Sequence, residues 1–346
     1  MSQNNQVSSG ESADSEVSGT DTKTNANGPW NWHPEVPLEM PPLFVWPPRP
    51  LEAIKFLAGK GFLLSQYFLF AVLAIVTWKY LLPPMAQWAT FSLGWIAHVF
   101  ILNTVLSLVV AGGLHLYFHA WKKQGTIHKY DKRELARNNK AFLFNNQIWD
   151  NMFWSLISGT LFWTGWQILF MWLYANGLLP WSVFSENPVW FVVAFVVIAA
   201  WESMHFYFIH RMIHWPPLYR IAHALHHKNV VIGPWSGLSM HPIEHVIYFS
   251  TPILHLFMAS HPIHLFYHMY ITALGAYTGH VGYEDYQVKG KSVIGVANFF
   301  HTLHHRYFEC NYGTSMMPWD KWLGTMHNGT AEDTSLINQR RMKMYQ

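Results

Sequence analysis

Four long apolar segments restrict this chain to a protein that spans a lipid bilayer, because a helix needs about 20 apolar residues to cross the hydrocarbon core. The segments of this length are residues 62–82, 88–116, 152–173 and 189–213. A further apolar stretch, residues 246–277, is interrupted by Ser260-His261-Pro262, and each of its halves is too short to cross alone. We therefore predict an all-α integral membrane bundle of about four transmembrane helices and a re-entrant or bent hairpin, with a helical cytoplasmic cap.

The composition excludes several other classes of protein. Only 12% of the residues are charged, which is half of the roughly 25% found in a typical soluble domain. The net charge of +3 comes without a basic stripe, so we expect no nucleic-acid partner. The single cysteine, Cys310, excludes an intramolecular disulfide framework and cysteine-rich zinc or iron–sulfur modules.

The composition also changes along the chain. Residues 1–28 are polar and almost free of large apolar side chains, which predicts a disordered tail. Residues 29–60 are rich in Pro and Trp and are expected to lie near a membrane interface. We assign residues 61–187 to N-terminal transmembrane helices, residues 188–328 to a histidine-rich domain and residues 329–346 to a C-terminal tail.

Basic residues are distributed unequally between the links that join the apolar segments. A cluster of Lys and Arg side chains lies between Lys122 and Lys140, whereas residues 176–188 contain neither type. Cytoplasmic loops carry an excess of these residues, so we place the first of these links in the cytoplasm. By alternation, the chain after residue 213 begins on the same side, which predicts a cytoplasmic location for the histidine motifs and the C-terminus.

Histidine is unusually frequent, with 22 residues against 19 acidic ones. The motif HxxxH ends the fourth apolar segment, and the motif HxxHH follows it twice. The residues of these three motifs are His210 and His214, then His223, His226 and His227, and finally His301, His304 and His305. Residues i, i+3 and i+4 share one face of a helix, so each motif can direct its imidazoles towards one centre.

Metal binding explains these motifs better than packing does, because imidazoles clustered at a membrane surface would compete for few partners. Eight imidazoles exceed what one zinc ion accepts, so we predict two metal ions. Imidazole suits Zn, Cu, Fe and Ni alike, and this chemistry leaves the choice of metal open. The absence of an HExxH motif argues against a metalloprotease.

Residues 189–324 resemble the fatty acid hydroxylase/sterol desaturase superfamily of membrane di-iron oxygenases. The resemblance includes the three histidine motifs and two further segments, His241-Pro-Ile-Glu244 and His280-Val-Gly-Tyr-Glu284. It also includes a closing region with Asn311-Tyr-Gly313 and Trp319-Asp320. The resemblance makes residues 188–328 the catalytic domain of an oxidoreductase.

The resemblance implies that two iron ions are bound, with Zn²⁺ as an alternative occupant in purified protein. The implied metal ligands are His210, His214, His223, His226, His227, His280, His301, His304 and His305. Candidates for a further ligand or a supporting position are His241, Glu244, His245, Glu284, Glu202, His205 and Asn311.

The implied reaction is the O2-dependent hydroxylation or desaturation of a lipid, such as a sterol or a fatty acyl chain. His33-Pro34-Glu35 differs from the HPGG motif of a cytochrome b5 module. We therefore expect no fused haem domain and a separate electron donor, which is a cytochrome b5, a ferredoxin or a reductase.

Two alternatives remain open: a lipid enzyme with zinc or two irons that needs no oxygen, and a membrane protein that binds metal or haem without catalysis. A transporter would hold its polar site near the bilayer midplane. The histidine motifs are instead predicted at the cytoplasmic ends, which favours an enzyme.

Overall fold

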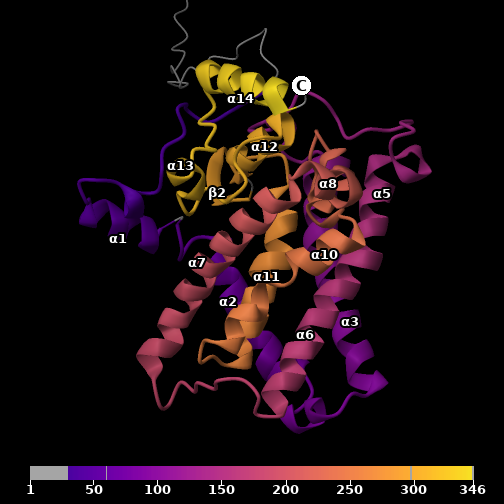
Figure 1. Ribbon diagram of the computed structural model, residues 1–346, viewed down its shortest axis with the longest axis vertical. Helices are drawn as coiled ribbons and strands as arrows, with labels where there is room; N and C mark the ends of the chain where they lie inside the picture. The colour runs from indigo at the N-terminus through magenta and orange to yellow at the C-terminus, as the bar shows by residue number, and fades with distance from the viewer. Residues whose placement is uncertain (1–29, 60, 297, 345–346) are drawn as a thin grey trace, which may run out of the picture.

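The computed structural model describes residues 30–59, 61–296 and 298–344, so the tail predicted at residues 1–28 lies outside the described residues. Long helices form a bundle, and shorter elements cover one end of it (Figure 1). The predicted all-α membrane bundle is confirmed.

Three helical stretches within the described residues are long and apolar enough to cross a membrane. The first, Leu93–Ala120, contains α3 (Leu93–Ser107) and α4 (Gly113–His115), and the second, Gln147–Ala175, contains α5 (Gln147–Phe153) and α6 (Thr160–Ala175). The third is α7 (Pro188–Ile213). Their outward faces carry exposed apolar side chains, such as Val109 and Val192, as expected for surfaces that contact lipid.

The first predicted segment, residues 62–82, is helical over a shorter range than expected. The helix α2 (Gln66–Val76) begins where the Ser65 side chain accepts a hydrogen bond from the Tyr67 backbone N–H, an N-cap that satisfies one of the free donors at a helix start. A π-helical turn continues it to Leu81. The resulting apolar helix is shorter than the three spanning stretches.

The predicted hairpin consists of two unlike limbs. The first contains α10 (Pro242–Tyr248) and a 3-10 helix, Thr251–Leu256, and the second is the continuous helix α11 (Pro262–Gly279). Thirteen of the 18 residues of α11 are buried, and the helix packs against α2, α6 and α7. Because it is surrounded by protein on all sides, α11 is the central helix of the bundle and not a lipid-facing one.

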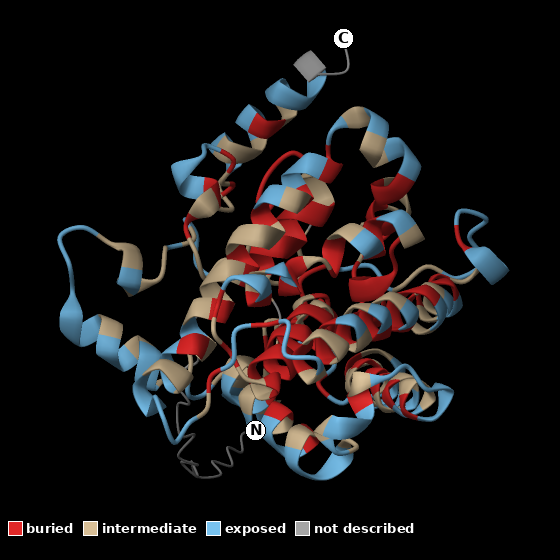
Figure 2. Ribbon diagram, turned by 60° about the horizontal axis from the view of Figure 1, so that its bottom comes forward, coloured by how far each residue is buried: buried red, intermediate tan, exposed pale blue. Residues whose placement is uncertain are grey.

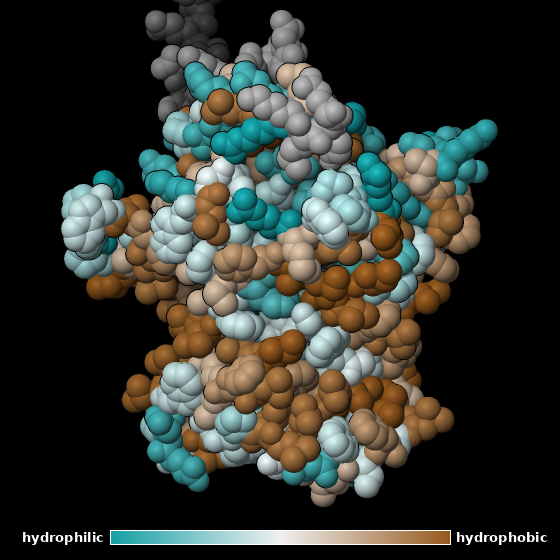
Figure 3. Space-filling view, in the orientation of Figure 1, coloured by the Kyte–Doolittle hydropathy of each residue, from teal (hydrophilic) through white to brown (hydrophobic). Residues whose placement is uncertain are grey.

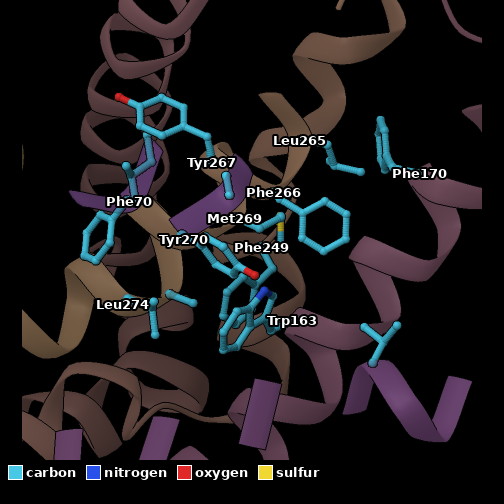
Figure 4. Close-up of a cluster of buried hydrophobic side chains, with 14 of the residues drawn as sticks. Phe70, Trp163, Phe170, Phe249, Leu265, Phe266, Tyr267, Met269, Tyr270 and Leu274 are labelled. Atoms are coloured by element: carbon cyan, nitrogen blue, oxygen red, sulfur yellow. The ribbon is translucent and has the colours of Figure 1, made fainter. Parts of the chain in front are cut away.

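Aromatic and aliphatic side chains from several helices pack around α11 (Figure 4). Phe266 and Tyr270 of α11 lie among Phe70 of α2, Trp163 of α6 and Phe249, which follows α10. Buried residues gather in the middle of the bundle, and exposed ones lie on its outer faces (Figure 2). This apolar core fixes the ends of the helices relative to one another.

Histidines outside the three motifs form hydrogen bonds within this bundle. His255 Nε2 lies 3.2 Å from His268 Nδ1, and His268 Nε2 lies 2.7 Å from the Thr251 hydroxyl. His264 Nε2 donates to the Phe191 carbonyl oxygen, and His261 accepts a hydrogen bond from the backbone at the start of α11. These four histidines therefore have hydrogen-bonded packing positions.

Most of the elements after α7, apart from α10 and α11, form a cap at one end of the bundle (Figure 1). Its helices are α8 (Pro216–Leu218), α9 (Ala224–His227), α12 (Phe299–Tyr307), α13 (Trp319–Trp322) and α14 (Ala331–Met344). The cap also contains an antiparallel hairpin of β1 (Asp285–Val288) and β2 (Lys291–Gly295). This hairpin was not predicted, and it turns at Lys289 and Gly290, whose positive φ angles suit a tight two-residue turn.

The remaining helix, α1 (Pro50–Ala58), lies beside the bundle and exposes Leu51, Ile54 and Leu57. On the face seen in Figure 3, hydrophobic side chains cover much of the bundle, and hydrophilic ones gather over the end that carries α12, α13 and α14. The cap therefore lies at one edge of the part of the molecule that suits a membrane.

Candidate metal centre

Nine buried histidines gather into two clusters at the junction of the bundle and the cap. Cluster one consists of His210, His214, His223, His227 and His304. Cluster two consists of His226, His280, His301 and His305. The nitrogen atoms that each cluster offers to a metal lie within 4.8 Å of one another. All nine histidines that the sequence singles out as ligands are thus brought together.

Local structure at the end of α7 brings the first two motifs together. His210 lies in the last turn of α7, and His214 is the residue at which the helix ends, just before Pro216. A π-helical turn, Tyr219–His223, then leads into α9. A proline cannot continue a helix interior, so the chain reverses here and returns the second motif to the first.

Each HxxHH motif contributes to both clusters, which differs from the expectation that one motif serves one centre. His223 and His227 belong to cluster one, whereas His226 between them belongs to cluster two. In the last motif the assignment is reversed, because His304 is the residue that joins cluster one. Adjacent residues on a helix point about 100° apart, so His226 and His227 cannot face the same centre.

Backbone carbonyl groups orient several of these imidazoles. The Nδ1 atom of His210 lies 2.7 Å from the Tyr312 carbonyl oxygen, and that of His304 lies 2.6 Å from the Cys310 carbonyl oxygen. A carbonyl oxygen can only accept, so each Nδ1 must carry the proton and donate it. The lone pair is therefore on Nε2, which faces the cluster.

His223 is oriented in the same way by a carboxylate. Its Nδ1 atom lies 2.7 Å from Oε1 of Glu244, and both side chains are buried. Glu244 lies in the first turn of α10, and His241 caps that helix by accepting a hydrogen bond from the Ile243 backbone N–H. A carboxylate behind a ligating histidine fixes the ring and raises its basicity. Glu244 thus supports cluster one from outside it.

The arrangement of the Nε2 atoms fits a metal ion. His210 Nε2 and His223 Nε2 are 3.2 Å apart, although the Nδ1 partners place a lone pair on both. Two facing lone pairs repel each other unless a cation lies between them. Two nitrogens ~2.1 Å from one ion and at right angles to each other would be ~3.0 Å apart. Spacings of 3.0–3.2 Å recur among Nε2 atoms in both clusters, so both donor sets fit a metal.

Burial also keeps the imidazoles in the form that binds metal. Desolvation lowers the pKa of His223, His227 and His304 well below the usual range, and the neighbouring imidazoles lower it further. A metal ligand must be unprotonated. These three histidines are therefore neutral at physiological pH and ready to bind a cation.

Other residues that the sequence suggested lie outside both clusters. His245 contacts the Ser158 hydroxyl through Nδ1, at 3.0 Å, and His205 contacts the Ser250 hydroxyl through Nε2, at 2.9 Å. The first bond connects α10 to the π-helical turn Trp154–Gly159, and the second connects α7 to the turn after α10. These two histidines have supporting positions in the packing and do not face a cluster.

Glu284 and Asn311 hold the cap together. Glu284 accepts a hydrogen bond from the Tyr130 hydroxyl. The Asn311 side chain donates to the carbonyl oxygens of Phe300 and His327, each at 3.0 Å, and so connects the start of α12 to the chain after α13. Neither residue lies in a cluster.

A further residue, Asp320, supports the site in a way that sequence reasoning did not identify. Its two carboxylate oxygens accept hydrogen bonds from the backbone N–H groups of Tyr312 and Gly313, both at 2.8 Å. This contact fixes the loop whose carbonyl group orients His210. The closing Trp319-Asp320 motif pointed to this region of the sequence. It could not indicate which backbone carbonyl group orients His210, because every residue carries one.

A cavity of about 260 Å³ adjoins both clusters. Residues of α2, α7 and α11, among them Phe70, Phe206 and Ile271, line its walls. His210 of cluster one and His280 of cluster two reach its surface. The cavity therefore connects the histidine clusters with the apolar interior of the bundle.

Residues 192–325 match the family model described as fatty acid hydroxylase. Relatives include the Delta(7)-sterol 5(6)-desaturase of Candida albicans, 33% identical over 33% of this chain and 29% of the relative. The enzyme of that name from Saccharomyces cerevisiae is 32% identical over 34% of this chain and 32% of the relative. That from Gibberella zeae is 27% identical over 43% of this chain and 46% of the relative. The matches thus span less than half of each relative, and no solved structure matches this chain.

Proposed function

We propose that this chain, a member of the superfamily of fatty acid hydroxylases and sterol desaturases, is a membrane-bound di-iron oxygenase. Its reaction is the hydroxylation or desaturation of a lipid with O2. The observation that carries the proposal is the pair of histidine clusters beside an apolar cavity. Iron bound there would activate O2, with electrons from a separate donor, for attack on an unactivated C–H bond, which no amino-acid side chain can do.

The ligands proposed for one iron are the five histidines of cluster one, and those for the other are the four histidines of cluster two. The side chains around them position the substrate and keep water out. Phe206 lies against the His210 ring, with ring centroids 4.8 Å apart, and Ile209 and Ile213 line the same side of the cavity. An apolar, shaped cavity of this kind is typical of a site for a small hydrophobic molecule.

A sterol or a related lipid is the substrate class that we propose, because the relatives carry the name Delta(7)-sterol 5(6)-desaturase. Cells that produce the chain should contain a lipid that lacks two hydrogens or has gained an oxygen, in comparison with cells that produce the variant His304→Ala. The product should require O2. Identical lipid extracts would contradict the proposal and favour non-catalytic metal binding. A product formed without O2 would favour an oxygen-independent lipid enzyme.

We further propose that the histidine clusters and the C-terminus face the cytoplasm, where a separate electron donor such as a cytochrome b5, a ferredoxin or a reductase can reach them. The basic segment 122–140 lies at the same end as the clusters, because the Tyr130 N–H donates to the Gly282 carbonyl oxygen. The link without Lys or Arg, residues 176–188, is tied to the start of α11 by the Ser182 N–H and the Ser260 carbonyl oxygen. The excess of positive charge is therefore on the side of the cap.

This orientation predicts the accessibility of two reporters. A reporter fused after Gln346 should be cytoplasmic, and one inserted next to Asn187 should be on the opposite side of the membrane. Protease protection in sealed vesicles of known orientation measures both. A C-terminal reporter on the outer side would contradict the orientation, because the clusters would then be separated from a cytoplasmic electron supply.

Replacement of Glu244 by Gln should weaken metal binding without unfolding the protein. The amide retains the shape of the side chain but loses the charge that stabilises the His223 N–H group. Changes behind a metal ligand typically cost 10–100-fold in metal affinity or activity, and we expect a loss of about that size. Metal affinity and turnover of the purified variant are the measurements. Unchanged affinity would show that Glu244 serves only the packing of α10.

A further inference from the structure

Glu202 has no partner among the described residues that explains its place in the bundle. The side chain lies in the spanning helix α7 and is only 8% exposed. Among the described residues, none forms a hydrogen bond or an ion pair with its carboxyl group. An ionisable group in a membrane span is costly and is usually retained for function. The carboxyl group is therefore available to a partner from outside the described residues.

The surroundings of Glu202 show where such a partner would lie. Glu202, Phe206, Ile209, His210 and Ile213 all line the cavity, and their spacing places them on one face of α7. With a rise of 1.5 Å per residue, Glu202 lies ~12 Å from His210 along the helix axis. The cavity thus has the histidine clusters near one end of this face and a carboxyl group near the other.

A second polar group lines the same part of the cavity. Tyr67, in the first turn of α2, contributes to the wall. Burial raises the pKa of its hydroxyl, and the Glu202 carboxyl group raises this pKa further. Tyr248 also lines the cavity, but its hydroxyl already donates to the Thr272 carbonyl oxygen. Glu202 and Tyr67 therefore offer an acceptor and a donor to the contents of the cavity.

We propose that Glu202 and Tyr67 form a binding site for the hydroxyl group of a lipid substrate. The lipid hydroxyl donates a hydrogen bond to Glu202 and accepts one from Tyr67. This inference rests on the proposed function, since it takes the cavity to be the lipid site. It adds a constraint on the substrate: the hydroxyl lies towards the Glu202 end of the cavity and the oxidised carbon towards the histidine clusters.

Binding measurements test this proposal without any need for turnover. The full-length protein is placed in phosphatidylcholine nanodiscs, and the binding of two alcohols is compared with that of their methyl ethers. The probes are cholesterol and its 3-O-methyl ether for a ring skeleton, and hexadecan-1-ol and 1-methoxyhexadecane for a chain. An ether oxygen accepts a hydrogen bond but cannot donate one. The wild-type protein should bind at least one alcohol about 10-fold more tightly than its ether, because the ether leaves the buried acceptor of Glu202 unpaired.

Two variants separate the roles of the two residues. Glu202→Leu should weaken the binding of the preferred alcohol about 10-fold and leave the ether unchanged, because only the alcohol donates a hydrogen bond. Tyr67→Phe should weaken the binding of the alcohol and of the ether alike, because both oxygens accept a hydrogen bond from the Tyr67 hydroxyl. Glu202→Gln retains an acceptor and should fall between the wild-type protein and Glu202→Leu. Val196→Ala, on the exposed side of α7, is the matched control and should bind all probes as the wild-type protein does.

Three outcomes would overturn the inference. The first is a wild-type protein that binds the alcohols and their ethers with equal affinity. The second is a Glu202→Leu variant that loses the same affinity for the alcohol as for the ether. The third is a wild-type protein that binds hexadecylamine more tightly than hexadecan-1-ol. The last outcome would assign Glu202 to a cationic group. The metal content of Glu202→Gln should equal that of the wild-type protein, and a loss would give Glu202 a role at the clusters instead. A protein that binds the alcohols as expected but oxidises no lipid would contradict the proposed function and not this site.

Discussion

Replacement of His227 by alanine is expected to abolish turnover and to empty cluster one. Its Nε2 atom lies 3.1 Å from that of His214 and 3.0 Å from that of His304, so the substitution removes a central donor of the cluster. Changes to residues behind the ligands typically cost 10–100-fold. The loss of a ligand itself should lower metal affinity and turnover by more than ~100-fold. Both quantities are measured on the purified protein, together with its amount in the membrane.

The matched control for this substitution is His245→Asn. His245 is also completely buried, but it contacts Ser158 and the Leu238 carbonyl oxygen instead of a cluster. The variant should lose some stability and retain its metal and its activity. If His227→Ala kept turnover close to that of the wild-type protein, the assignment of cluster one as a metal site would be wrong.

Protein loaded with ferrous iron without oxygen is expected to hold close to two ions per chain, one for each cluster. His210→Ala should remove the ion of cluster one, and His280→Ala the ion of cluster two, so that each variant retains about one ion. Protein purified without iron loading is expected to carry zinc, because imidazole sites bind zinc more tightly than ferrous iron. Elemental analysis of the three proteins measures these contents.

The comparison of the two variants makes this prediction specific. A single site shared by all nine histidines would lose its whole metal content in either variant. A content of one ion or less in iron-loaded wild-type protein would also count against two sites. A variant that retains one ion but loses turnover would show that both clusters are needed for the reaction.

Helical spacing was sufficient to predict that the eight histidines of the three motifs lie close together, whereas His280 was indicated only by the family resemblance. The i, i+3, i+4 pattern brings His301, His304 and His305 towards one region, and all three lie there. The pattern did not predict how they divide between two clusters, because this depends on where α9 and α12 lie relative to each other. Residue types also gave no indication of the carbonyl groups of Tyr312 and Cys310 that orient the imidazoles.

The fold was predictable to a similar extent. Apolar length located the spanning helices, since crossing a bilayer requires it. It could not distinguish α11 from a lipid-facing helix, because lipid and a protein core select similar side chains. The late start of α2 at Ser65 and the β1–β2 hairpin depend on local hydrogen bonds and backbone angles, which hydropathy does not report.

The division of each HxxHH motif between two clusters has a thermodynamic consequence. A cation in cluster one restrains both α9 and α12, since His227 and His304 lie on these helices. The same two helices carry His226 and His305 of cluster two, which are then already ordered. Filling one cluster thus reduces the entropy lost on filling the other, and this coupling is reciprocal. Two ions bound as we propose would therefore favour each other's uptake through the shared ordering of α9 and α12.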